Sequence, residues 1–517
     1  MSLTNLKSPG VFPMEVDKGT KPIEGVGTSI PAFVGMTAKA PVGFDPAGGV
    51  YESRSGKAVF VANWTQYVDQ FGEFVRDAFL PDMVYAYFAN GGGPCYVVSL
   101  RALDVELEGK PQTASVSIPS DNRSRTPSFV VRAKTPGEKG NNLSVVVESE
   151  EEGLFNLRIG DAEQKGLTLD AEQKNYVGNA RFEAVEISEI GSVAPKAGAY
   201  PLTGGKDAPS ASTLSALSVD DYRGSEKDRT GFGALVPLNI RLLVCPDIMV
   251  GYDGSPAAKE RVKLLQHEMN TYCENDRYCF ALLDTPPGMT PDEARAWKEE
   301  ELKLDSSYAA LYYPWIEMAD FQTGRTKLTP PSGVMAGVYN RVDAERGVHK
   351  APANEVLRGA IGLERDLSRN EQDILNPIGV NCIRAFPNRG IRAWGARTLS
   401  SDGSWRYINV RRLFMYVEAS MEVGLQWVVF EPNNQLLWGK VRRDVTAFLR
   451  GVWRSGALFG ASPTDGFYVK CDEELNPPDV RDKGILIIEV GMAPVKPAEF
   501  VIFRISQWVG ADAEAEE

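Results

Sequence analysis

The chain has 517 residues, of which 43% are hydrophobic and 24% charged, a balance typical of a soluble globular protein of about three domains. Its formal net charge of −13 argues against general nucleic-acid binding, which needs clustered Lys and Arg. We expect no secretory signal after Met1, and apolar runs such as Ile485–Ile488 are too short to span a bilayer. The six cysteines lack motif spacing, so we expect reduced core thiols in a cytoplasmic product.

Residues 1–24 contain Pro and Gly at a density that prevents a helix, and they are predicted to form an N-terminal extended arm. Apolar side chains stand between these breakers, whereas a disordered tail would be more polar. We therefore expect the arm to dock on a partner through its apolar residues, which are Leu3, Leu6, Val11, Phe12 and Met14.

Residues 25–101 are predicted to be the N-terminal part of an α/β core domain. Ile30–Met36, Ala58–Ala62 and Pro94–Leu100 have the composition of strands. Asn63 can cap a short helix, and a longer amphipathic helix with Leu80 and Val84 on one face should end at Gly91. No partner half for this unit follows nearby in the sequence.

Residues 102–205 have a different character, because apolar and polar residues alternate between clusters of Gly, Asp, Glu and Pro. Val145, Val147 and Leu157 belong to such alternating runs. This period-2 pattern predicts a small antiparallel β domain. We interpret it as an insertion, placed on the outer surface, because the α/β pattern resumes after Gly205.

Residues 206–375 are predicted to form a middle α/β domain in which strands and helices alternate. Arg241–Asp247, Tyr278–Leu283 and Ala309–Ile316 should be strands of a parallel sheet covered on both faces. Ser255 with Pro256 should open one helix, and the capping box that begins at Thr290 should open another.

Residues 376–492 are predicted to form the C-terminal core domain, and residues 493–517 a C-terminal strand with an acidic tail. Gln435–Arg450 should be a helix, and Gly484–Gly491 and Pro494–Trp508 should be two strands. The second strand is apolar on both faces, and such a strand at an open edge would recruit another chain. Its apolar residues are Phe500, Val501, Ile502, Phe503 and Ile505.

Motifs for chemistry are weak, and we predict neither catalytic, cofactor-binding nor metal-binding residues. The segment around Gly56-Lys57 matches a phosphate-binding loop only in part. Tyr51 stands where the first glycine belongs, and Ala58 stands where a Ser or Thr would hold Mg²⁺. The chain has two histidines, His267 and His349, and it contains no Gly-x-Ser-x-Gly motif of a serine hydrolase. The cysteines and histidines do not have the spacing of zinc ligands. We expect His267 to face solvent.

Long motifs spread over the chain resemble contractile tail sheath proteins, those of phage tails and of extracellular contractile injection systems. The motifs are Pro330–Asp343, Gly347–Asn354, Leu375–Arg384, Gly390–Leu399, Trp405–Phe414, Phe430–Asn433 and Pro497–Phe500, with Ser8–Val11, Ala32–Gly35, Phe88–Gly92 and Leu202–Gly205 before them. They cover nearly the whole chain apart from the β insertion. Their pattern is closer to injection-system sheaths.

The resemblance implies an α/β multidomain sheath subunit, with a core built from N- and C-terminal parts and a middle domain that is subtilisin-like in fold only. It implies no enzyme and no cofactor, but a homo-oligomer of stacked six-fold rings around an inner tube protein, with baseplate and cap or terminator proteins as further partners. Nucleic acid and direct membrane insertion are not expected. Assembly would occur in the cytoplasm, as part of a phage tail-like particle that is released or acts at the membrane.

In that family the terminal arms of one subunit join the sheets of its neighbours by β-strand addition, which would give both apolar termini one use. The expected helix Gln435–Arg450 carries four cations, which are Lys440, Arg442, Arg443 and Arg450. These side chains could contact the inner tube; the alternative is that they form a solvated helix face. Two other classes stay open, namely a degenerate subtilisin-like hydrolase and a non-contractile tube or capsid protein.

Overall fold

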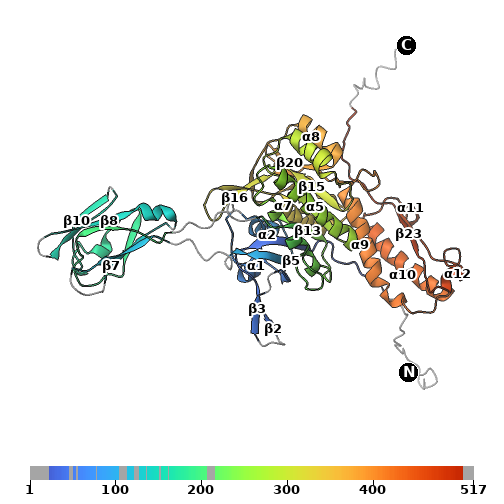
Figure 1. The fold of residues 1–517 in the computed structure, drawn as a ribbon. Coiled ribbons are helices and arrows are strands. Elements are labelled where there is room, and N and C mark those ends of the chain that lie inside the picture. Colours follow the sequence, from blue (N-terminus) through green and yellow to red (C-terminus); the bar gives the residue numbers. More distant parts are fainter. Residues whose placement is uncertain are drawn as a thin grey trace, which may run out of the picture.

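The computed structural model describes residues 22–45, 50–53, 56–76, 78–103, 113–121, 127–135, 137–150, 153–160, 162–205 and 216–504. Its body is organised around one nine-stranded sheet with the order β18-β21-β20-β15-β14-β13-β1-β5-β4 (Figure 1). These strands are β1 (Pro31–Thr37), β4 (Ala58–Val61), β5 (Cys95–Ala102), β13 (Leu242–Val244), β14 (Phe280–Asp284), β15 (Ala309–Tyr313), β18 (Glu355–Val356), β20 (Val380–Phe386) and β21 (Gly390–Ala393).

The centre of this sheet is parallel, from β5 through β1, β13, β14 and β15 to β20, while β4 and β21 pair antiparallel towards the edges. Strands β1, β14 and β15 are buried along their entire length, which explains their nearly continuous apolar sequences. The sheet takes strands from three segments that the sequence treats separately, 25–101, 206–375 and 376–492. The strands of residues 25–101, for which the sequence showed no partner half nearby, therefore pair with strands from the later segments.

Helices cover both faces of the nine-stranded sheet. On one face α1 (Trp64–Phe71), α2 (Leu80–Ala89) and α7 (Ser332–Arg346) share a core with Phe33 and Tyr312. On the other, α5 (Pro256–Asp276) and α6 (Pro291–Ala296) pack with residues of the opposite strand faces. The expected caps are confirmed: Asn63, Ser255 and Thr290 each accept a hydrogen bond from the first turn of their helix.

Shorter elements complete the body. They are a hairpin of β2 (Val42–Asp45) and β3 (Val50–Ser53), a sheet of β16 (Ile316–Ala319), β17 (Thr326–Thr329) and β19 (Ala360–Leu363), and the helices α4 (Val219–Arg223) and α8 (Arg369–Leu375).

Residues 113–205 form two antiparallel sheets around a core of their own, which includes Phe129, Phe155 and Leu157. The sheets are β10-β9-β8-β12 and β11-β7-β6, with β6 (Ser115–Pro119), β7 (Pro127–Ala133), β8 (Ser144–Ser149), β9 (Phe155–Ile159), β10 (Ala162–Leu167), β11 (Val185–Ser188) and β12 (Gly198–Pro201). Figure 1 shows this unit standing away from the body.

The last part of the chain packs two long helices, α9 (Ile408–Gly424) and α10 (Gln435–Arg454), with α11 (Pro463–Gly466), α12 (Pro478–Arg481) and a two-stranded sheet. The sheet pairs β22 (Phe467–Lys470) with β23 (Glu489–Met492) in antiparallel register. A separate core that includes Leu413, Trp438 and Val445 holds this C-terminal unit together.

The two terminal strands predicted from sequence differ from those observed. Within Gly484–Gly491 only the residues from Glu489 onward pair as a strand, and Pro494–Trp508 belongs to no sheet over its described residues, 494–504. The physical reason is that the described part of the chain offers residues 496–504 no neighbouring strand with which to exchange backbone hydrogen bonds. His267 is also not solvent-facing as expected, because it is half-buried with its Nε2 2.8 Å from the Leu302 carbonyl oxygen.

Candidate functional site

The C-terminal segment is tied to the body up to Glu499 and is exposed beyond it. After β23, the N–H of Phe459 donates to the Ala493 carbonyl at 2.8 Å, and the N–H of Val495 donates to the Ala457 carbonyl at 3.1 Å. The four residues that follow Glu499 have large apolar side chains in water: Phe500 is 74% exposed and Ile502 83%. Val501 and Phe503 are exposed to a similar extent.

Glu499 is the anchor of this segment, because its carboxylate accepts four hydrogen bonds from three parts of the fold. Arg397 binds it bidentately, with Nε 2.9 Å from Oε1 and one terminal nitrogen 2.6 Å from Oε2. Asn376 donates to Oε1 at 2.9 Å, and the Tyr407 hydroxyl donates to Oε2 at 3.1 Å. Burial acts to raise the pKa of Glu499, but the hydrogen bonds from Arg397 and Asn376 lower it below its usual value.

The anchor therefore fixes the position from which the exposed apolar segment 500–503 leaves the body. Paired Arg–carboxylate bonds set direction as well as position. In the described part of the chain, the backbone groups of residues 500–503 pair with no strand.

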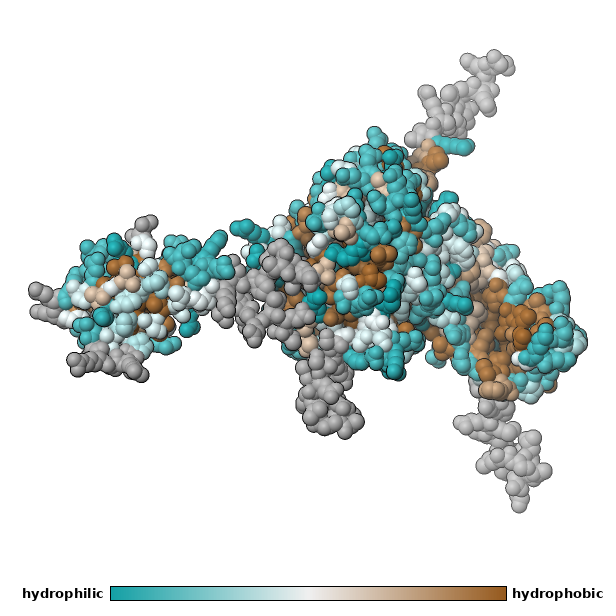
Figure 2. Space-filling view, viewed as in Figure 1, coloured by the Kyte–Doolittle hydropathy of each residue, from teal (hydrophilic) through white to brown (hydrophobic). Residues whose placement is uncertain are grey.

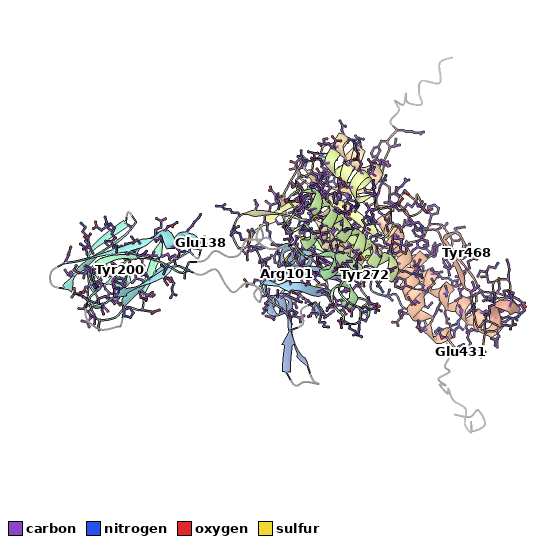
Figure 3. The ribbon with its side chains drawn as sticks, viewed as in Figure 1. Arg101, Glu138, Tyr200, Tyr272, Glu431 and Tyr468 are labelled. Atoms are coloured by element: carbon purple, nitrogen blue, oxygen red, sulfur yellow. The ribbon has the colours of Figure 1, made fainter. Side chains whose placement is uncertain are left out.

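A second exposed feature lies on the C-terminal unit. The sheet of β22 and β23 has only two strands, so each has one edge without a strand neighbour among the described residues. Tyr468 on β22 is 55% exposed beside this open sheet, and Figure 3 labels it at the surface of the unit. Such an edge can accept an added strand through main-chain hydrogen bonds.

Helix α10 carries the four cations that the sequence singled out. Asn434 caps it by accepting from the backbone N–H groups of Leu436 and Leu437, while Leu437, Val441 and Val445 are buried on its inner side. Lys440, Arg442, Arg443 and Arg450 are all exposed. Arg442, Arg443 and Arg450 line one shallow groove of about 380 Å³, in which Arg443 also contacts the buried Asp444 at 2.9 Å.

The remaining predicted site residues, Leu3, Leu6, Val11, Phe12, Met14 and Ile505, lie outside the described residues. The described chain begins beside the C-terminal unit, where Ile23 is buried in the core of α9 and α10. The N–H of Val26 donates to the Ser420 hydroxyl at 3.2 Å. The N-terminal segment thus enters the fold at α9, and the C-terminal segment leaves it beside Arg397 and Asn376.

Sequence reasoning missed the residues that anchor Glu499. Asn376, Arg397 and Tyr407 are separated from it by about a hundred positions. No periodicity or spacing connects them, although all three lie within the motifs that carry the resemblance. Among the described residues, no helix is both long and apolar enough to span a membrane.

Two family models match adjacent parts of the chain. The phage tail sheath protein central domain matches residues 246–399, and the phage tail sheath C-terminal domain matches residues 400–507. Together these matches span just over half of the chain.

Curated relatives and solved structures extend the likeness to nearly the whole chain. A tail sheath protein of Burkholderia phage BcepMu is 24% identical, over 96% of this chain and 95% of that protein. A putative prophage major tail sheath protein of Pseudomonas aeruginosa is 26% identical, over 54% of this chain and 71% of that protein.

Among solved structures, the contracted helical sheath of the anti-feeding prophage (AFP) matches with a TM-score of 0.56 and 25% identity, covering 97% of this chain and 99% of that one. The contracted PVC sheath complex, an extracellular contractile injection system, has the same fold, with a TM-score of 0.57, 24% identity and coverage of 98% and 99%. The chain therefore belongs to the contractile tail sheath family and is a subunit of such a sheath.

Proposed function

We propose that this subunit polymerises around an inner tube protein and that sheath contraction drives the tube through a target envelope. The observation that carries the proposal is the apolar segment Phe500–Phe503, exposed but fixed in position by Glu499. Six-fold rings, stacked between a baseplate and a cap or terminator, would form the sheath. Relatives described as a contracted sheath and as a baseplate assembly support this arrangement.

Subunits are linked in this proposal by strand exchange. Residues 500–503, continued by Ile505, would leave one subunit as a strand and add to the open edge of β22 or β23 in a neighbour. The apolar residues of the N-terminal arm, Leu3, Leu6, Val11, Phe12 and Met14, would supply a second strand. Main-chain hydrogen bonds make such a link insensitive to the rotation of the subunit bodies, which contraction requires.

The strand exchange can be tested by ending the chain after Glu499. This variant keeps the four hydrogen bonds of the anchor and removes the apolar strand, so it should remain folded but form no polymer. Deleting residues 1–14 should have the same effect. Negative-stain microscopy is the measurement, and truncated subunits that still formed helically striated sheaths would refute the exchange.

Contraction needs no nucleotide here, since its free energy would come from contact area gained between subunits. Stable protein interfaces bury roughly 1,200–2,000 Å². A sheath of this kind should show two lengths in micrographs, whereas a non-contractile tube or capsid protein would show one.

The inner tube would be contacted by α10. Arg442, Arg443 and Arg450 share a groove, and Lys440 is exposed on the same helix. Exposed ion pairs contribute only about 0–1 kcal/mol each, so a moving sheath could exchange them at low cost. Reversing the charge of Arg442 and Arg443 should abolish co-assembly with the tube, and co-assembly of that variant would exclude this role.

The other parts of the chain fit a structural role without catalysis, cofactor, nucleic acid or membrane insertion. In this proposal the middle segment 206–375 is subtilisin-like in fold only, and the β insertion 102–205 lies on the outer surface of the sheath. Segments 25–101 and 376–492 form the core domain, with 1–24 and 493–517 as arms. Assembly takes place in the cytoplasm, within a phage tail-like particle that is then released or acts at the membrane. An active-site serine probe that labelled the protein would contradict the non-enzymatic role.

A further inference from the structure

The first described stretch of the chain is held by side chains and not by a neighbouring strand. Residues 26–29 belong to no helix or strand, yet the main chain of each one hydrogen-bonds to a side chain from elsewhere in the fold. The pairs are Val26 with Ser420 at 3.2 Å, Gly27 with Arg241 at 3.1 Å, Thr28 with Arg412 at 2.9 Å and Ser29 with Asn340 at 3.1 Å. We call the side chains of Arg241, Asn340, Arg412 and Ser420 the N-terminal clamp.

The N-terminal clamp draws its members from three parts of the fold. Arg412 and Ser420 are on α9, Asn340 is on α7, and Arg241 directly precedes β13. The Val26 N–H donates to the Ser420 hydroxyl, whereas the other three bonds run from clamp side chains to main-chain carbonyl oxygens. Because all four bonds are made to the main chain, they fix the path of the segment independently of its own side chains.

Arg412 is the most deeply buried charge of the clamp. It binds Asp343 bidentately at 2.9 and 2.6 Å, both side chains are 3% exposed, and its guanidinium lies 4.8 Å from the centre of the Tyr339 ring. Taking such a pair out of water costs free energy that its Coulomb attraction often only balances. The geometry explains the pair better, since it orients one terminal nitrogen of Arg412 to donate to the Thr28 carbonyl.

The hold on the main chain extends by packing to Ile23. Ile23 is 8% exposed and belongs to the core of the C-terminal unit. Gly25 lies against Tyr416, and a Cβ on this glycine would overlap the Tyr416 hydroxyl. The chain is thus held from Ile23 to Ser29, where the proposed N-terminal arm meets the body.

Helix α9 also holds the C-terminal segment. The Asn409 amide donates to the Val495 carbonyl at 3.1 Å, and Asn409, Arg412 and Ser420 lie on one face of α9, because they are three and eight residues apart. At 1.5 Å per residue, Asn409 and Ser420 are about 16 Å apart along the helix. This helix belongs to the C-terminal unit, over which Figure 2 shows hydrophobic surface gathered. Both terminal segments are therefore tied to one helix.

We propose that the N-terminal clamp is the fixed base of the N-terminal arm, and that its four side chains position the arm for strand addition to a neighbouring subunit. A tethered strand reaches its acceptor more readily when its base is fixed, because fewer orientations compete with the productive one. The inference rests on the strand exchange proposed above. Since α9 also binds the C-terminal segment, both links of a subunit are carried by one helix.

The hold on the main chain can be measured on dilute subunits with a nitroxide label at Glu24→Cys. Glu24 is exposed and the six native cysteines are buried, so the label attaches selectively. The otherwise wild-type chain should give the spectrum of a restricted label. The double variant Asn340→Ala/Ser420→Ala, which loses the bonds to Val26 and Ser29, should give a more mobile one. Identical spectra would overturn the clamp.

A matched control removes side-chain bonds to the main chain elsewhere. Asn141→Ala/Ser128→Ala removes the bonds of Asn141 to Gly205 and of Ser128 to Val193, all within residues 113–205. This control pair should leave the spectrum of the label at residue 24 unchanged. A label that became equally mobile in the control would show a general loosening of the protein and would overturn the assignment to the clamp.

The positioning role is tested by polymerisation of full-length chains. Phe12→Ala, which shortens an apolar side chain of the arm, should raise the protein concentration needed for polymerisation by roughly 10-fold in the wild-type and control backgrounds. In the Asn340→Ala/Ser420→Ala background the arm is no longer positioned, so the same substitution should raise it by less than about twofold. Equal factors in all three backgrounds would overturn the positioning role.

Failure of the strand exchange itself gives a different result. If Phe12→Ala has no effect in the wild-type background, the N-terminal strand exchange is wrong and the positioning role falls with it, whereas the label spectra still decide whether the clamp holds the chain. If the double variant shows no melting transition, Ser420→Ala alone replaces it and should reduce the factor for Phe12→Ala to roughly 3- to 5-fold. A factor that stayed at the wild-type value would overturn the positioning role.

Discussion

At the scale of single residues, the body depends on carboxylates that join sheet to helix without a basic partner. Asp247 follows β13 and accepts hydrogen bonds from the N–H groups of Met36, Phe79 and Leu80, at 2.6, 2.6 and 3.1 Å. Asp284 ends β14 and accepts from the N–H of Ser332 at 2.8 Å. Both carboxylates thus bind the orphan N–H groups at the start of α2 and α7, which fixes these helices to the carboxyl edge of the sheet.

From the carboxylates of Asp247 and Asp284 we predict that the folded subunit loses stability as the pH rises. Burial raises the pKa of Asp247 to about 6 and that of Asp284 to about 7, from an ordinary value of 3.8, although their hydrogen bonds oppose the shift. Between pH 4 and 7 the folded state holds protons that the unfolded state has released, so unfolding becomes easier as pH increases. The loss should be roughly 1–3 kcal/mol per group, measured by chemical denaturation of dilute subunits at pH 5 and 8.

Asp284→Asn provides the control for this pH effect. The amide keeps an oxygen for the Ser332 N–H and cannot ionise, so the variant should show a smaller difference between pH 5 and 8 than the wild type. An unchanged difference would mean that Asp284 does not titrate in this range. Asp247→Asn is less suitable, because both of its oxygens already accept N–H groups.

At the scale of elements, α2 and α7 pack so closely that two glycines of α7 leave no space for a side chain. A Cβ on Gly333 would lie 2.4 Å from the Met83 Cβ, and a Cβ on Gly337 would lie 2.6 Å from the Tyr87 carbonyl oxygen. The spacing of four residues places both glycines on one face of the helix. The Pro330–Asp343 motif therefore has a packing role in the body.

Gly337→Ala should destabilise the subunit by roughly 1–3 kcal/mol, because the added methyl group forces α7 away from α2. Gly439→Ala, at an uncrowded position of α10, is the matched substitution and should instead stabilise by roughly 0.5–1 kcal/mol, the helix preference for Ala over Gly. Thermal and denaturant unfolding measure both. Equal effects of the two substitutions would show that the helix contact is looser than described.

At the scale of the whole molecule, four hydrophobic core clusters define three units. The body has one core cluster on each face of the nine-stranded sheet, the C-terminal unit has its own core, and residues 113–205 have a separate core that includes Phe129 and Leu157. Leu103 and Leu217, which flank the separately folded residues 113–205 in sequence, belong to one core cluster of the body. The insertion therefore leaves and re-enters the body at the same core.

Replacing residues 104–215 by a short Gly/Ser linker should consequently leave the body folded, with a melting temperature within a few degrees of the wild type. Expressed alone, residues 113–205 should give a cooperative unfolding transition, since their core is complete without the body. Circular dichroism and calorimetry of both fragments are the measurements. A body that fails to fold without the insertion would show that the two units share stabilising contacts.

The sequence by itself determined several helix starts and the family. Capping residues such as Asn63, Ser255 and Thr290 specify helix starts through neighbouring side chains, and long motifs identify the sheath family. Only the tertiary structure decided which distant segments share the nine-stranded sheet, and that Arg397, Asn376 and Tyr407 converge on Glu499. It also decided that residues 496–504 find no strand partner among the described residues. The physical reason is that pattern and propensity act over a few residues, whereas strand pairing and ion-pair geometry depend on segments that only folding brings together.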